Sequence, residues 1–194
     1  EIAQCLVGSE MCIRDSYNGL IPRNPFIQFH ISPNVKEREY LTEDELKAVM
    51  THEFADSKLA YIRDIFIFAS FTVLSFVDIQ ELTNDNIVEV NGEKWILSKR
   101  HKTKVAFQVK LLDIPLQIVE RYRPMQKDNR IFPDLNYWSI CKPLKRMIRE
   151  CGITKSISFH CSRHGFATLA LSKGMPIESV SRVLGHTNIV TTQL

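Results

Sequence analysis

One stretch of this sequence constrains the fold most strongly: YIRDIFIFASFTVLSF, residues 61–76, is apolar on almost every side. A surface helix would show a polar face, so a helix here must be a central core element covered by its neighbours. With 194 residues, the chain can bury about 70 per cent of its unfolded surface. No apolar run reaches the roughly 18 residues that a membrane span requires. The sequence therefore predicts a soluble globular domain built around this segment.

Periodicity and turn signals place helices on both sides of a short β-meander. Thr42 and Glu45 stand at capping-box spacing, which predicts a helix from about Thr42 to His52. Two β-rich runs, DNIVEV and EKWILSK, flank Asn91-Gly92, a strong hairpin signal, and KVAFQVKLL supplies a third strand. Helical patterns return in LQIVERYRPMQ, NYWSICKPLKRMIRECG, residues 157–171 and PIESVSRVLG. The predicted fold class is mainly α with a small three-stranded antiparallel β-sheet, an α+β fold.

The first 39 residues read differently from the rest. Residues 1–16 show no clean periodicity, and LVGSEMCIRDS resembles sequence read through from a cloning or sequencing adapter, so this leader is excluded from fold reasoning. Residues 17–39 contain three prolines and an Asn-Gly pair, which is typical of a linker that leaves an upstream domain. We expect one folded domain over residues 40–194.

Charge is divided unequally along the chain. Residues 1–93 carry 7 Lys and Arg against 16 Asp and Glu, whereas residues 94–194 carry 18 against 6, giving net charges of −9 and +12. The basic half is a candidate surface for a polyanion, although solvated helix faces would give the same count. The cations expected on this surface are Lys99, Arg100, Lys102, Lys104, Arg121, Arg123, Lys142, Lys145, Arg146 and Arg149. Five scattered cysteines argue against a disulfide framework and favour a reducing cytoplasm.

The stretch ISFHCSRHGFATLAL places an imidazole, a guanidinium and a second imidazole where a buried helix begins. On a helix, His160 and His164 are i, i+4 neighbours and Arg163 lies beside them, so all three can face one pocket. Such donors suit a phosphate whose negative charge grows in a transition state. Two alternatives stay open: the side chains could cap a helix, or both histidines could hold zinc with His186 as third ligand. Arg163 would oppose a metal ion electrostatically.

Two further segments can contribute to the same pocket. His186 directly follows Gly185, where a glycine turn can aim its imidazole back toward Arg163. Arg100 and Lys102 alternate on a predicted strand, so both should face one side of the sheet. A lysine near a scissile phosphate can protonate a leaving oxygen, although a lone strand lysine is more often simply exposed.

The segment FHCSRHGFATLALSKGMPIESVSRVLGHTNIVTTQL resembles the C-terminal signature of the tyrosine recombinase, or phage-type integrase, family. The resemblance assigns residues 40–194 to the catalytic domain, and NGLIPRNPF resembles the end of the family's core-binding domain. It implies that Arg163 clamps the scissile phosphate while His160 and His186 donate hydrogen bonds or assist proton transfer. Lys102 would be the general acid for the 5′-hydroxyl leaving group. His164 matches a position that supports the pocket.

Two departures from the family pattern matter. The family's first arginine follows Thr-Gly-Leu, but Ser75 stands at that position here, and a hydroxyl cannot replace a bidentate cation. Arg100 is the preferred substitute because it would share a strand face with Lys102; Arg63 is the rival. The family's tyrosine nucleophile would fall at position 195, and the sequence ends at Leu194. We therefore expect this fragment to bind DNA without cleaving it.

The resemblance also implies partners and an environment. These are duplex DNA, no metal or cofactor, a homotetramer on paired sites for the full-length protein, and a bacterial-type cytoplasm with nucleoid association when bound. As this fragment, the chain should be a monomer. The main alternative is a non-catalytic DNA-binding regulator in which residues 176–185 and the preceding helix form a helix-turn-helix. A zinc-dependent hydrolase using His160, His164 and His186 is a third class of function.

Overall fold

The structure is a computed structural model that describes residues 13–20, 22, 39–101, 104–126 and 128–184. The chain divides into two compact units, Glu1–Glu37 and Arg38–Leu194. In the first unit, the described residues form a short helix over residues 13–17. The leader and linker predicted for residues 1–39 fall mostly outside the described residues and stay predictions. Within the described ranges, no helix combines the length and apolar character needed to cross a bilayer.

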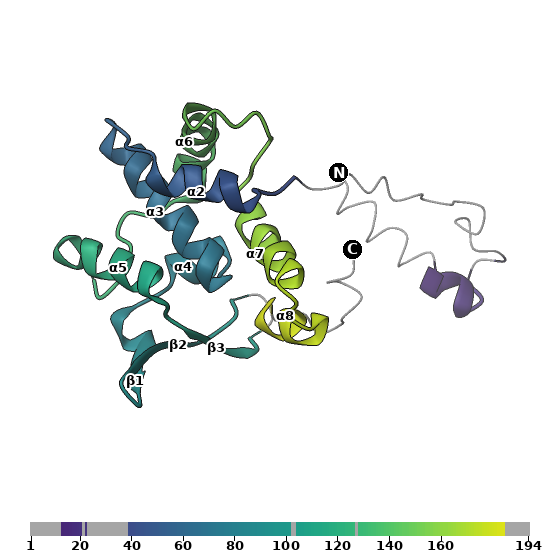
Figure 1. Ribbon diagram of the computed structural model, residues 1–194. Helices are drawn as coiled ribbons and strands as arrows, with labels where there is room; N and C mark the ends of the chain where they lie inside the picture. Colours follow the sequence, from purple (N-terminus) through teal and green to yellow (C-terminus); the bar gives the residue numbers. More distant parts are fainter. Residues whose placement is uncertain (1–12, 21, 23–38, 102–103, 127, 185–194) are drawn as a thin grey trace. The chain divides into compact units, whose positions relative to one another are not determined.

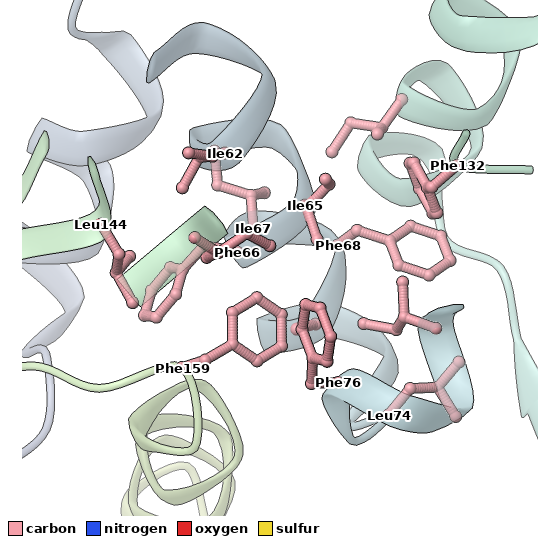
Figure 2. Close-up of a cluster of buried hydrophobic side chains, with 14 of the residues drawn as sticks. Ile62, Ile65, Phe66, Ile67, Phe68, Leu74, Phe76, Phe132, Leu144 and Phe159 are labelled. Atoms are coloured by element: carbon pink, nitrogen blue, oxygen red, sulfur yellow. The ribbon is translucent and has the colours of Figure 1, made fainter. Parts of the chain in front are cut away.

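The second unit is built around α3, Ser57–Thr72, as the apolar stretch predicts. The helices α2 (Glu43–Thr51), α5 (Asp113–Tyr122), α6 (Tyr137–Glu150) and α7 (Cys161–Ser172) pack against it (Figure 1). Figure 2 shows Phe66 and Phe68 on different sides of α3. The Phe66 ring lies 6.1 Å from the ring of Phe159, and the Phe68 ring lies 5.0 Å from the ring of Phe132. The helix is thus buried around most of its circumference.

The predicted core segment is nevertheless not one helix through residue 76. α3 ends at Thr72, Val73 adopts the left-handed conformation with φ of 60°, and α4 spans Phe76–Gln80. Ser75 begins α4 with a capping box: its hydroxyl accepts from the Asp78 N–H and its own N–H donates to the Asp78 carboxylate, both at 3.3 Å. The Ser75 hydroxyl also donates to this carboxylate at 2.8 Å. Satisfying the first N–H groups of a second helix in this way makes a break before Phe76 favourable.

The three-stranded antiparallel sheet is confirmed. Its order is β1-β2-β3, with strands Ile87–Val90, Glu93–Lys99 and Ala106–Lys110. Asn91 and Gly92 join the first two strands with φ of 53° and 78°, as a type I′ turn requires. The register places Ile96 between Ile87 and Val109 on the buried face. This face packs on the core, and the hairpin prediction is correct.

β2 ends at Lys99, one residue before Arg100, which was predicted to lie on a strand. The Arg100 N–H donates to the Val105 carbonyl and the Lys104 N–H donates to the Arg100 carbonyl, both at 2.8 Å. Arg100 therefore closes a turn after β2, and the prediction that it lies on a strand with Lys102 is wrong. These two bonds give both the N–H and the carbonyl of Arg100 a hydrogen-bond partner, as buried backbone groups require. Lys102 itself lies outside the described residues.

The helix ends follow local signals in the sequence. At the start of α2, the Thr42 N–H donates to the Glu45 carboxylate at 2.7 Å and the Glu45 N–H donates to the Thr42 hydroxyl at 3.3 Å, which confirms the capping box. Gly152, with φ of 75°, follows α6 as expected. The remaining elements are two 3₁₀ turns, Asn84–Asn86 and Arg123–Met125, and α8, Ile177–Leu184.

A second, smaller apolar cluster attaches α8 to the domain. Val180 and Leu184 of α8 pack with Ala170 of α7 and with Val73 at the end of α3. Val180 and Val73 are completely buried. α8 is therefore held by a satellite cluster rather than by the main core.

A buried carboxylate joins α3 to α5. Asp64 accepts hydrogen bonds from Arg63 Nε at 2.8 Å, Arg121 Nη1 at 2.7 Å and the Tyr122 hydroxyl at 2.8 Å. Its side chain is almost completely buried. Burial together with the hydrogen bond to Asp64 raises the pKa of Tyr122, so the phenol stays protonated and donates. These bonds offset the cost of burying the charge.

We predict that Asp64→Ala lowers the free energy of unfolding by about 3 kcal/mol, because it leaves the Tyr122 hydroxyl and two guanidiniums without their shared acceptor. Urea denaturation followed by circular dichroism measures this loss. Asp44→Ala, whose side chain is 99% exposed, serves as the control and should leave stability nearly unchanged. Equal effects of the two substitutions would contradict the prediction.

Candidate phosphate-binding site

Two guanidinium groups converge on the turn between α3 and α4. Arg163, in the first turn of α7, donates through Nη1 to the Val73 carbonyl oxygen at 2.6 Å. Arg100, directly after β2, donates through Nη1 to the same oxygen at 3.4 Å. These residues are 90 and 27 positions away from Val73 in the sequence, so tertiary packing assembles the pair. The structure thus brings together Arg163 and Arg100, as the sequence predicts.

Asp78 connects the start of α4 to Arg100 and His101 after β2. One carboxylate oxygen accepts from Arg100 Nη1 at 3.0 Å and from the Ser75 hydroxyl at 2.8 Å, and the other accepts from the His101 N–H at 2.9 Å. Burial opposes ionisation, but the bonds from His101, Ser75 and Arg100 outweigh it and hold the pKa of Asp78 below its usual value. Asp78 was not among the predicted site residues. The Ser-x-x-Asp spacing of a capping box was the signal that could have identified it.

Arg100 is deeply buried, with 6% of its surface exposed. Its guanidinium carbon lies 4.4 Å from the centroid of the Phe107 ring, and Nη2 donates to the Val183 carbonyl at 3.1 Å. Its buried Nε has no hydrogen-bond partner among the residues that the structure describes. The rival, Arg63, lies in the first half of α3 and does not reach this turn. It donates instead to the Asp64 carboxylate and to the His52 carbonyl.

Arg163 is held by two helix ends. Besides the bond to Val73, its Nη2 donates to the Leu184 carbonyl, the last residue of α8, at 2.6 Å. Burial and the neighbouring charge of Arg100 lower the pKa of Arg163 to about 10, with Asp78 acting in the opposite direction. The group remains charged at neutral pH. Like-charge repulsion is therefore built into the site in the absence of an anion.

A cavity of about 310 Å³ opens beside these groups. Leu74, Phe76 and Phe159 form apolar walls, and Figure 2 shows the rings of Phe76 and Phe159 next to each other. His160 and Arg163 supply the basic wall, whereas His164, predicted to face the same pocket, is not among the residues that line this cavity. The other lining residues are Ser75, Val77, Gln80 and Tyr137.

His160 occupies the N-cap position of α7 rather than its interior. Its ring centroid lies 4.8 Å from that of His164, with the rings nearly perpendicular. Within the described ranges, no group of three His, Cys, Asp or Glu side chains is arranged to hold a metal ion. His186, the third ligand in the zinc alternative, and Lys102 both lie outside those ranges, so their predicted places in the site stay predictions.

The ten cations predicted on one surface do not all lie at the surface. Arg100 is buried in the site beside Asp78, whereas Arg121 is exposed but its charge is paired with the buried Asp64. On α6, by contrast, Lys142, Lys145, Arg146 and Arg149 are exposed and line an open groove of about 450 Å³ with Glu150. α6 therefore provides the strongest basic surface seen among the described residues.

The family model described as the phage integrase family matches residues 39–194 of this sequence. The chain belongs to this family. Tyrosine recombinase XerC of Chlamydia trachomatis is 26% identical over 200 residues, covering 96% of this chain and 62% of the relative. The chain thus spans less than two thirds of the length of that integrase-family relative.

Solved structures of integrase-family proteins show the same fold. The XerH site-specific recombinase bound to its difH substrate matches with a TM-score of 0.67 at 21% identity, over 85% of this chain and 52% of that chain. The Tn1549 transposon integrase in complex with circular intermediate DNA matches with a TM-score of 0.75 at 16% identity, over 93% and 68%. The predicted α+β recombinase fold is confirmed, and the regulator alternative receives no support.

We predict that Asp78 stabilises the fold through its charge, as a comparison with Asp78→Asn should show. The stability advantage of the native protein over this variant should be constant above the ordinary carboxyl pKa of 3.8. It should shrink as pH falls below that value and through the lowered pKa of folded Asp78, because protonation removes the same charge. Urea denaturation of both proteins across this pH range measures the difference. An advantage that grows with acidification would contradict the prediction.

Proposed function

We propose that this chain is the catalytic domain of a site-specific recombinase that cleaves and rejoins DNA through a 3′-phosphotyrosine. A tyrosine oxygen bonds to phosphorus as the bond to the 5′ oxygen breaks. The 5′ oxygen receives a proton, and the tyrosine proton passes to a histidine. Rejoining reverses these steps, so no high-energy cofactor is consumed. The convergence of Arg100 and Arg163 beside Ser75 carries this proposal.

The proposed catalytic residues divide by role. Arg163 and Arg100 stabilise the charge that develops on the phosphate, with Arg100 in the place of the family arginine missing at Ser75. His160 and His186 donate hydrogen bonds to the phosphate or move protons, and Lys102 protonates the leaving oxygen. His101, the residue before Lys102, supports the assignment of Lys102. The His101 N–H donates to Asp78, which also accepts from Arg100.

Duplex DNA is the proposed substrate. The exposed cations of α6 suit backbone phosphates, which position a duplex without reading its sequence. Among the described residues, no carboxylate pairs with Lys142, Lys145 or Arg149, so their charge is available to an external anion. We further propose a homotetramer on paired sites for the full-length protein, a monomer for this fragment, and a cytoplasmic, nucleoid-bound setting in a bacterium.

The proposed activity predicts covalent capture of DNA. A form of the protein extended through the codons after Leu194 should form an SDS-stable adduct with a nicked suicide duplex, because the family's tyrosine is expected at position 195. The matched control carries phenylalanine at that position and should form no adduct. Gel electrophoresis of the labelled duplex measures capture. Persistence of the adduct in the phenylalanine form would exclude this tyrosine as the nucleophile.

The substitute role of Arg100 predicts a rescue. In the extended protein, Arg100→Met should slow cleavage by about a hundredfold, the effect of losing one donor to a developing oxyanion. Adding Ser75→Arg should recover part of the rate, because the new guanidinium restores the family pattern beside the cavity. Arg100→Lys keeps a charge near Asp78 but loses the fork, so it should fold and still cleave slowly.

Single-turnover rates per folded molecule are the appropriate measurement for these variants. Arg63→Met is the control, and it should lower stability without lowering this rate, since Arg63 donates to Asp64. Unchanged cleavage by Arg100→Met and Arg100→Lys would refute the substitution.

A further inference from the structure

The last two carbonyl groups of α8 hold the two site arginines. Val183 accepts from Arg100 Nη2 at 3.1 Å, and Leu184 accepts from Arg163 Nη2 at 2.6 Å. On their other Nη atoms, both guanidiniums donate to Val73, which ends α3. Each fork is therefore spanned by carbonyls from the ends of two different helices.

This arrangement serves both the helices and the arginines. The last carbonyls of a helix lack intrahelical partners and carry the negative end of its dipole, so cations stabilise them. The carbonyls in turn fix the rotation of each guanidinium plane. Arg163 also lines the cavity beside Ser75, so its orientation decides which N–H groups face an anion there. Preorganised donors bind a developing charge without a cost of reorganisation.

We propose that α8 is a positioning element of the phosphate site, and that Val180 is the positioning residue that keeps it docked. The proposal rests on the proposed function, since it specifies what orients the phosphate-binding arginines. Val180 carries no polar group and acts only through α8. Loosening α8 frees both forks and weakens phosphate binding.

The attachment of α8 makes this dependence testable. α8 packs through the satellite cluster of Val73, Ala170, Val180 and Leu184, separate from the main core around α3. A methyl-group deletion in this cluster can therefore loosen α8 while α3 keeps its packing. By linkage, an anion that binds the oriented arginines must stabilise the docked α8 to the same extent.

The experiment compares Val180→Ala with Val119→Ala. Both valines are nearly inaccessible, at 0% and 1% exposure, and both substitutions remove the same atoms, but Val119 packs in the main core. Binding of a fluorescein-labelled mixed-sequence duplex is measured by anisotropy over a range of salt concentrations, and stability by urea denaturation. Val180→Ala should bind about tenfold more weakly, a size typical of coupling between sites. Its log–log salt slope should become shallower by about 0.9, the loss of one phosphate contact.

Val119→Ala should lose comparable stability yet keep the affinity and salt slope of the native chain. Val180→Ile, which keeps a branched apolar side chain, should retain tight binding. Hydrogen exchange of the α8 amides should slow when the duplex binds the native chain, and this protection should be lost in Val180→Ala.

The outcomes separate this inference from the function on which it rests. Equal loss of affinity in both alanine variants, or an unchanged salt slope in Val180→Ala, would overturn the positioning role while leaving DNA binding intact. No binding of the duplex by the native chain, or binding that does not respond to salt, would overturn the proposed function itself.

Discussion

The Val73 carbonyl is the acceptor on which the site depends, because two like-charged guanidiniums meet at it inside the domain. Such a pair is unfavourable unless acceptors surround it. Val73, Val183, Leu184 and Asp78 supply them. The carbonyl points to the pair because α3 stops at Thr72 and Val73 turns left-handed, which costs a β-branched residue about 1–2 kcal/mol. Complete burial of its side chain in the α8 cluster offsets that strain.

Asp78 makes the sheet part of the site. In a family member with arginine in place of Ser75, the first cation would come from the α3–α4 turn itself. Here the proposed substitute, Arg100, lies in the turn after β2, so a helix and a sheet must keep their relative positions for the two cations to meet. The bonds from Asp78 to Ser75, Arg100 and His101 supply that connection. The buried carboxylate of Asp78 therefore holds Arg100 near a turn to which a residue at position 75 would be attached directly.

The sequence was most informative where structure is local. Capping-box spacing located α2, Asn91-Gly92 located the hairpin, and continuous apolar character identified α3 as the core helix. The break at Val73 could not be predicted from the local sequence. A β-branched residue adopts the left-handed conformation only when packing and hydrogen bonds with residues far away in the sequence stabilise it. Arg100 does meet Arg163 at the Val73 carbonyl, but it does so from a turn and not from the predicted strand face. Net charge likewise counts cations without showing that interior carboxylates require Arg100 and Arg121.

The charge balance of the site suits an anion. Among the described residues at the turn, Asp78 supplies one negative charge against two guanidiniums, and the neighbouring carbonyls contribute only partial charges. Burial, and to a smaller extent the neighbouring charge of Arg100, lowers the pKa of Arg163. The proposed phosphate would relieve that repulsion and meet donors that are already oriented, so little side-chain entropy would be lost on binding. Main-chain acceptors and the apolar burial of α8 stabilise the two neighbouring charges during folding, and these preorganised charges would strengthen binding of the proposed phosphate.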